Sequence, residues 1–220
     1  MHVPESPLHR DLKHLYAARC GGELEKRVEG FRVDVISGDT IYEIQVKNLY
    51  KIKRKIQILA SAGYNAVIVH PLQGILDVEL PLRRRRRIRR DQNPLRAFIE
   101  LPYVATTIAM ERVALEIPLL HEVRTQKQWR RNRVRNTRLV EVMELWRVDE
   151  PGDLVSLLPA RLPPQFTTRE IASSCQVGYD LACKIAYVLN RSGAAEKVGR
   201  RGRFHLYSLK QATPEIGKTE

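Results

Sequence analysis

Cysteine is scarce in this chain, which contains only Cys20, Cys175 and Cys183. Three irregularly spaced thiols exclude a disulfide framework, and they lack the paired spacing of a zinc site. Six histidines are equally scattered, and none stands at metal-ligand spacing from a cysteine or from another histidine. The cysteines are therefore expected to be free thiols buried in the fold.

Long apolar runs are also missing. No stretch of about 18 apolar residues could form a membrane-spanning helix, and residues 1–16 lack the apolar core of a signal peptide. These two absences predict a cytoplasmic protein.

Acidic residues are outnumbered. The chain of 220 residues has 38 lysines and arginines against 25 aspartates and glutamates, a formal net charge of +13. The basic residues are clustered, which favours a polyanionic partner because neutralising phosphates releases counterions. Nucleic acid is the first expectation and an anionic membrane surface the second. The length allows one domain with a full core and a smaller second domain.

The N-terminal third alternates between helical and strand patterns. Apolar residues at helical spacing predict a helix over residues 8–19, which two glycines end. Two strands joined by a Gly-Asp turn follow, then an amphipathic helix over 49–63 and a short apolar strand over 66–69. A strand, an amphipathic helix and a buried strand indicate a parallel crossover. The expected fold class is α/β, with the order α-β-β-β-α-β and a mixed sheet.

The two strands of this hairpin carry a polar cluster made of Asp34, Glu43, Gln45 and Lys47. Because side chains alternate along a strand, Glu43, Gln45 and Lys47 are expected on one face. A two-residue Gly38-Asp39 loop would place Asp34 directly across from Glu43. A three-residue loop would send Asp34 to the opposite face, and the sequence permits both. We predict the two-residue loop.

Acids beside a lysine at the edge of a mixed sheet suit metal-dependent hydrolysis of phosphodiesters. Carboxylates hold Mg²⁺ or Mn²⁺, the metal activates water, and the lysine supports the nucleophile or the phosphate. The cluster and the order of elements resemble the PD-(D/E)XK nuclease superfamily, which has a restriction-endonuclease-like core. The resemblance implies that Asp34 is the first acid and Lys47 the lysine. It also makes Glu25 a loose match to an acid that some members place after the first helix.

Gln45 stands where that superfamily usually has its second acid. The segment Gln45-Val46-Lys47 is similar to the Gln-x-Lys variant of the Mrr-like restriction branch, so a metal would be bound by Asp34, Glu43 and Gln45. A competing alignment takes Glu43-Ile44-Gln45 as the motif, which leaves the site without its lysine and inactive. The cluster can also be an ordinary cross-strand charge group on a solvated face.

Two runs of basic residues lie in the middle of the chain. Residues 82–90 include Arg84, Arg85 and Arg86, and are expected to form either a solvated loop or a direct phosphate contact. Residues 124–138 carry seven basic residues and no acid. They predict a second basic loop, with Arg130, Arg131 and Arg133 as candidate DNA contacts.

The C-terminal part has clear helix signals. Thr167 and Glu170 have the spacing of a capping box, and a second amphipathic helix ends at Gly193. A hairpin with a basic tip follows, so residues 165–209 resemble the winged helix-turn-helix family. In that family the second helix enters the major groove and the wing touches the backbone or minor groove. The resemblance implies DNA contacts by Gln176, Tyr179, Lys184, Arg191, Arg200, Arg201 and Arg203.

These patterns predict a two-domain DNA-binding protein. Residues 1–158 would be a nuclease-like domain with a basic middle extension, and residues 159–220 a winged helix-turn-helix domain. The expected partner is duplex or branched DNA rather than a membrane. The expected activity is Mg²⁺- or Mn²⁺-dependent endonuclease cleavage. The sequence also allows the protein to form a homodimer. One alternative function is that of a DNA-binding or regulatory protein built on a catalytically inactive nuclease scaffold. A second is an assembly subunit whose basic loops hold RNA or an acidic partner.

Overall fold

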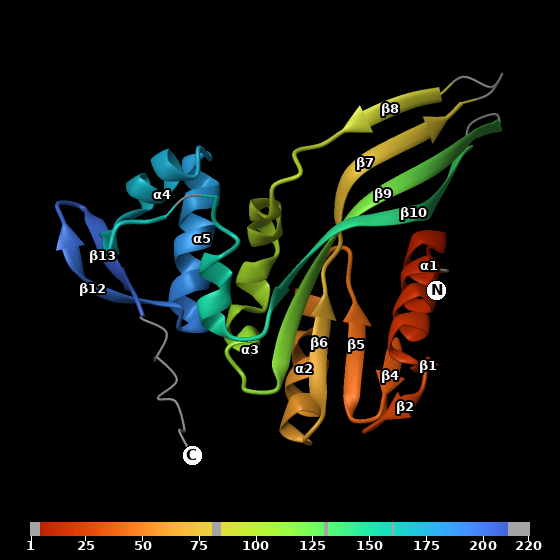
Figure 1. Ribbon diagram of the computed structural model, residues 1–220, viewed down its shortest axis with the longest axis horizontal. Coiled ribbons are helices and arrows are strands. Elements are labelled where there is room, and N and C mark those ends of the chain that lie inside the picture. The colour runs from red at the N-terminus through yellow and green to blue at the C-terminus, as the bar shows by residue number, and fades with distance from the viewer. Residues whose placement is uncertain (1–4, 81–84, 130–131, 160, 211–220) are drawn as a thin grey trace, which may run out of the picture.

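The protein is an α/β molecule with a large sheet and a smaller C-terminal helical part (Figure 1). The computed structural model describes residues 5–80, 85–129, 132–159 and 161–210. In chain order its elements are α1 (Pro7–Cys20), β1 (Glu23–Leu24), β2 (Arg27–Val28), β3 (Phe31–Arg32), β4 (Val35–Ser37), β5 (Thr40–Ile44), α2 (Tyr50–Ser61), β6 (Asn65–Val69), β7 (Leu72–Glu79), β8 (Arg85–Arg89), η1 (Pro94–Ile99), η2 (Leu101–Tyr103), α3 (Ala105–Ile108), β9 (Val113–Trp129), β10 (Asn132–Val148), η3 (Pro151–Val155), β11 (Gln165–Phe166), α4 (Thr168–Ser174), α5 (Tyr179–Ser192), β12 (Ala195–Arg201) and β13 (Phe204–Leu209).

The large sheet has eight strands and is mixed, in the order β1-β4-β5-β6-β9-β7-β8 with β10 paired to β9. Its first part follows the predicted α-β-β-β-α-β order, as α1, β1, β4, β5, α2 and β6, with the short β2–β3 ladder inserted. Strands β6 and β7 pair in succession, both in parallel, with β9. Pro71 lies at the break between them, where its missing N–H cannot join a ladder.

Helices α1 and α2 cover opposite faces of the sheet. Val67 and Val69 of β6 pack with α1, whereas Ala66 and Ile68 pack with α2. Successive strand residues point to opposite faces, so this alternation places one helix on each side. The two faces of strand β6 are thus both buried, as the all-apolar run over 66–69 predicted.

The hairpin register agrees with the prediction. Ser37 pairs with Thr40, so β4 and β5 are joined by the two-residue Gly38-Asp39 loop. Gly38 has a φ of +59°, which glycine adopts without steric cost. The predicted first helix is also present, and it ends at Gly21 in the left-handed conformation.

Residues 124–138 were predicted as a loop and residues 82–90 as a solvated loop or a phosphate contact, and the loop prediction was wrong for the described parts of both runs. Residues 85–89 form β8, which pairs antiparallel with β7. Most of residues 124–138 lie within β9 and β10, each of 17 residues, which pair as one long hairpin. Strand β8 is at the edge of the sheet, where no buried face imposes an apolar alternation on the sequence. The parallel β7–β9 pairing directs both hairpins to the same end of the sheet (Figure 1).

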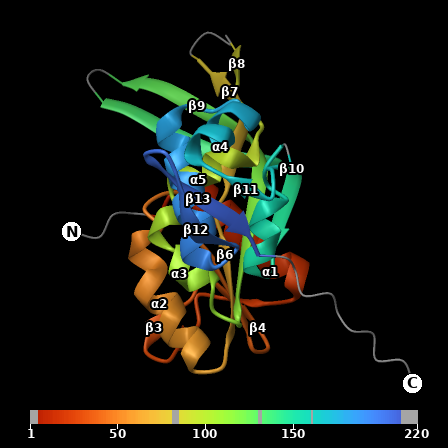
Figure 2. The same ribbon diagram turned by 90° about the vertical axis from the view of Figure 1, so that its left-hand side faces the viewer.

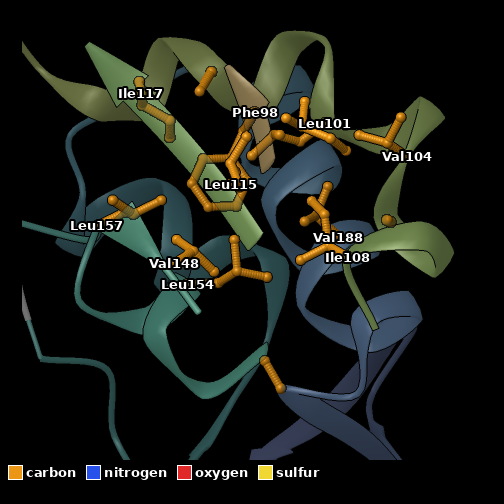
Figure 3. Close-up of a cluster of buried hydrophobic side chains, with 14 of the residues drawn as sticks. Phe98, Leu101, Val104, Ile108, Leu115, Ile117, Val148, Leu154, Leu157 and Val188 are labelled. Carbon is orange, nitrogen blue, oxygen red and sulfur yellow. The ribbon is translucent and has the colours of Figure 1, made fainter. Parts of the chain in front are cut away.

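The C-terminal part consists of α4, α5 and a three-stranded antiparallel sheet in the order β11-β13-β12, which faces the viewer in Figure 2. Thr167 and Glu170 form the predicted capping box, and Gly193 ends α5 in the left-handed conformation. Helix α5 packs against η1, η2, α3 and η3. Phe98, Leu115, Leu154 and Val188 therefore belong to one hydrophobic core (Figure 3).

The predicted domain boundary between residues 158 and 159 falls inside this core. Leu157 and Leu158 before the boundary and Leu162 after it are all buried in the same cluster. Cys175 is buried, Cys20 and Cys183 are half-buried, and all three are free thiols. Within the described residues, no helix is long and apolar enough to cross a membrane.

Candidate active site and nucleic-acid interface

Asp34 and Glu43 lie side by side where the β4–β5 hairpin opens. The Asp34 N–H donates to Glu43 Oε1 at 3.1 Å, and the Ile44 N–H donates to Asp34 Oδ2 at 2.9 Å. The two-residue turn places these residues across from each other, as predicted. Each carboxylate thus accepts a backbone N–H from the neighbouring strand, which fixes the acidic pair in place.

Asp34 has a basic partner on α1. His9 Nε2 lies 3.2 Å from Asp34 Oδ2 and 3.0 Å from the Ile44 carbonyl oxygen, and His9 Nδ1 lies 2.7 Å from Glu5 Oε1. Both ring nitrogens face acceptors, so the doubly protonated imidazolium fits best. Burial alone would lower the pKa of His9, but Asp34 and Glu5 outweigh it and raise that pKa. For Asp34 the directions are reversed. Burial by itself would raise the pKa of Asp34, but the contact with His9 holds that pKa below its usual value.

Glu43 has its basic partner on α2. Lys55 Nζ contacts Glu43 Oε1 and the carbonyl oxygen of Arg32. The Glu43 side chain is only 5% exposed. Burial, together with the charge of Asp34, raises the pKa of Glu43 to about 7 despite the contact with Lys55. A carboxyl that titrates near neutrality beside a second acid and an amine has the character of a functional site.

Glu25 belongs to a neighbouring ion network. Its carboxylate contacts Lys13 and Arg32, which lower its pKa. Lys13 also contacts Glu5, the residue that bonds His9. The network connects Glu25 to the acidic pair indirectly, through Lys13, Glu5 and His9.

Gln45 and Lys47 lie beyond the end of β5. The Gln45 side-chain amide donates to the Lys47 carbonyl oxygen, while the Gln45 N–H donates to the Val69 carbonyl oxygen at 2.8 Å. The exposed Lys47 lines a separate cavity. It is Lys55 of α2 that places its amine on Glu43 of the acidic pair. The catalytic role of Lys47 stays a prediction.

Both acids that would bind a metal already have protein partners. Asp34 is occupied by His9 and the Ile44 N–H, Glu43 by Lys55 and the Asp34 N–H, and the Gln45 amide faces Lys47. Across the described parts of the chain, no three His, Cys, Asp or Glu side chains converge as the ligands of one ion would. The pair therefore offers Mg²⁺ or Mn²⁺ two carboxylates, each already held through one oxygen.

A cavity of about 730 Å³ lies at the carboxyl ends of the parallel strands β5 and β6. Open α/β sheets bind ligands at this position. Its wall includes the buried His70, whose Nδ1–H donates to the Gln45 carbonyl oxygen at 2.9 Å. Burial lowers the pKa of His70, which favours its neutral ring. Charged residues also line the cavity, namely Lys47, Arg90, Arg96, Arg124, Glu100 and Glu122.

The predicted C-terminal contacts lie on the turn between α4 and α5, on α5 and on the β12–β13 hairpin. Gln176, Tyr179, Arg191, Arg200 and Arg203 are exposed. Two of the predicted cations have acidic partners: Lys184 Nζ lies 2.8 Å from Asp180 Oδ2, and Arg201 Nη1 lies 2.7 Å from Glu170 Oε1.

Only part of the two basic runs can be placed. Arg85 and Arg86 are exposed on β8, and Arg85 lies 3.3 Å from Glu79. Arg84, Arg130 and Arg131 lie outside the described residues, as does the side chain of Arg133.

Residues 6–150 match a family model described as a domain of unknown function, DUF8091. The chain belongs to this family. No curated protein and no solved structure matches the chain. The DUF8091 match covers the acidic pair and the cavity, and it ends before the C-terminal helices.

Sequence reasoning missed two contacts of the DUF8091 region, those of His9 and Lys55. Lys55 is on the polar side of a helix whose Ile52 and Ile56 are buried, and His9 is 25 residues from its partner Asp34. Only the α-β-β-β-α-β order, which brings both helices against the hairpin, could have indicated them.

Proposed function

We propose that the protein binds DNA through its C-terminal part, a winged helix carried on a restriction-endonuclease-like scaffold. The order β11, α4, α5, β12, β13 supports a winged helix, because two helices are followed by the β12–β13 hairpin, whose strand β13 pairs with β11. One observation carries the proposal. Arg191 on α5 and Arg200 and Arg203 on the hairpin are exposed, with no acidic partner among the described residues.

The electrostatics support a phosphate backbone as the partner. The formal net charge is +13, and the C-terminal cations lie next to a helix that can approach a groove. Cations that neutralise phosphates release counterions, so binding weakens steeply as salt is added. An acidic patch on a protein partner could bind the same cations. Binding to duplexes of any sequence would favour DNA over such a protein as the partner.

The test is the salt dependence of duplex binding. Fluorescence anisotropy should give a linear decrease of log affinity with log salt concentration, and Arg200→Ala or Arg203→Ala should each reduce the slope by roughly 0.9. Arg112→Ala is the matched control, because Arg112 is exposed on the turn before β9, outside the C-terminal part. Equal slopes for Arg200→Ala, Arg203→Ala and the wild type would show that the hairpin does not touch DNA.

A second function, cleavage of phosphodiester bonds at the acidic pair, is favoured by one observation. Asp34, Glu43 and Lys55 bring two acids and an amine together on the predicted core, and the pKa of Glu43 is raised to about 7. Mg²⁺ or Mn²⁺ would require these acids to release His9 and Lys55. Nicking of supercoiled plasmid with either ion tests this function. Absence of nicking would show that the acidic pair has a structural role and no catalytic one.

A further inference from the structure

A groove of about 400 Å³ separates α5 from the β12–β13 hairpin. One wall is a stripe on α5, where Tyr179, Cys183 and Tyr187 follow each other at four-residue spacing on one helix face. Phe204 and His205 of β13 form the other wall. The volume lies within the range of pockets that hold small organic groups, about 300–1,000 Å³.

The tyrosines of this groove are unusually exposed. Tyr179 is 52% exposed and Tyr187 is 49% exposed. Tyr179 is oriented by Thr168, whose hydroxyl lies 3.2 Å from the Tyr179 hydroxyl. Large aromatic side chains that stay in water on a concave surface indicate a binding site rather than a core.

Cations surround these rings. Arg191, Lys197 and Arg203 line the groove, and Arg169 and Arg203 place their guanidinium groups 4.4 and 5.2 Å from the centre of the Phe204 ring. No acidic side chain lines the groove among the residues described. The occupant must therefore offer flat apolar faces together with negative charge.

We infer that the groove binds the unpaired nucleotides of a single strand, with bases stacked on Tyr179 and Tyr187 and phosphates held by the arginines. In a duplex the base faces are hidden in the stack, and only base edges and phosphates are offered. Unpaired bases expose the faces that aromatic side chains recognise. The inference rests on the proposed DNA-binding function and assigns it a substrate class, nucleic acid with an unpaired segment.

The experiment compares three labelled ligands: an oligothymidylate of about 12 nucleotides, the corresponding oligouridylate, and a duplex of the same length. Tyr187→Ala and Tyr179→Ala should each weaken single-strand binding about 5- to 150-fold, equivalent to the roughly 1–3 kcal/mol of one stacked base. Tyr187→Phe keeps the ring and should retain affinity. Tyr50→Ala is the control, since Tyr50 is 54% exposed on α2 and outside the groove.

The outcomes separate this inference from the proposed function. Single-strand binding that depends on the Tyr187 ring supports the groove, and the two single strands distinguish DNA from RNA as the preferred source. Quenching of 2-aminopurine placed in the strand, lost in Tyr187→Ala, would identify stacking. Duplex binding without single-strand binding, or single-strand binding that Tyr179→Ala and Tyr187→Ala leave unchanged, overturns the groove and leaves the proposed function standing. Binding of no ligand overturns both.

Discussion

Replacing Glu43 with glutamine isolates the effect of one buried acid on stability. Burial and the charge of Asp34 raise the pKa of Glu43 from 4.5 to about 7. Each tenfold change in proton affinity is worth about 1.4 kcal/mol, so ionising Glu43 costs the fold about 3 kcal/mol relative to the unfolded chain. Glutamine keeps the shape of the protonated acid and does not ionise.

The sign of the pH effect follows from the direction of this shift. An acid whose pKa is higher in the folded state contributes stability that is complete below its unfolded pKa and is lost as pH rises through its folded pKa. For Glu43 this window runs from pH 4.5 to about 7. The free energy of unfolding of the wild type should fall by about 3 kcal/mol relative to Glu43→Gln as pH rises from about 4 to about 8.

Urea unfolding at a series of pH values measures this difference. Subtracting the two curves removes the contributions of other titrating groups that the variant leaves unchanged. Glu111→Gln, at an exposed position, is the control and should give a curve parallel to the wild type. A curve of Glu43→Gln that is also parallel to the wild type would show that Glu43 is not a buried acid of raised pKa.

Two further predictions concern cleavage and the shared core. Gln45→Glu adds a negative charge one residue beyond the end of β5, which should strengthen the attraction of the acidic pair for Mg²⁺ or Mn²⁺, so nicking with either ion should increase. Asp34→Ala and Lys55→Met should abolish nicking and retain DNA binding. If neither the wild type nor Gln45→Glu cuts any form of DNA, the acidic pair has only a structural role. Phe98→Ala should cost about 3–5 kcal/mol because Phe98 is fully buried against α5, and circular dichroism should show one unfolding transition for the whole molecule. A separate early transition of the C-terminal helices would contradict the shared core.

Local signals in the sequence predicted much of the fold. The capping box of Thr167 and Glu170 and the glycine at the end of α5 depend only on residues a few positions apart. The sequence permitted a two-residue and a three-residue loop at Gly38-Asp39, and the predicted two-residue loop is the one that sets the register of β4 and β5. These predictions were confirmed since nothing distant in the chain competes with them.

The placement of Lys47 shows where such reasoning fails. Alternation puts Glu43, Gln45 and Lys47 on one face only while the strand continues, and β5 ends at Ile44. Asn48 then turns the chain with a φ of +61°. Lys47 consequently lines the neighbouring cavity, and Lys55 reaches Glu43 from the next helix. No local spacing encodes that contact, because it depends on how α2 packs on the sheet.

The shared core extends beyond the part of this chain that matches the DUF8091 model. The DUF8091 match stops at residue 150, yet the apolar surface of Phe98, Leu101 and Ile108 is completed by α5, well after that point. A chain cut at the family boundary would expose these side chains to water. The matched region of this chain is therefore smaller than the unit that shares one core, because the apolar surface of η1, η2 and α3 is covered by α5.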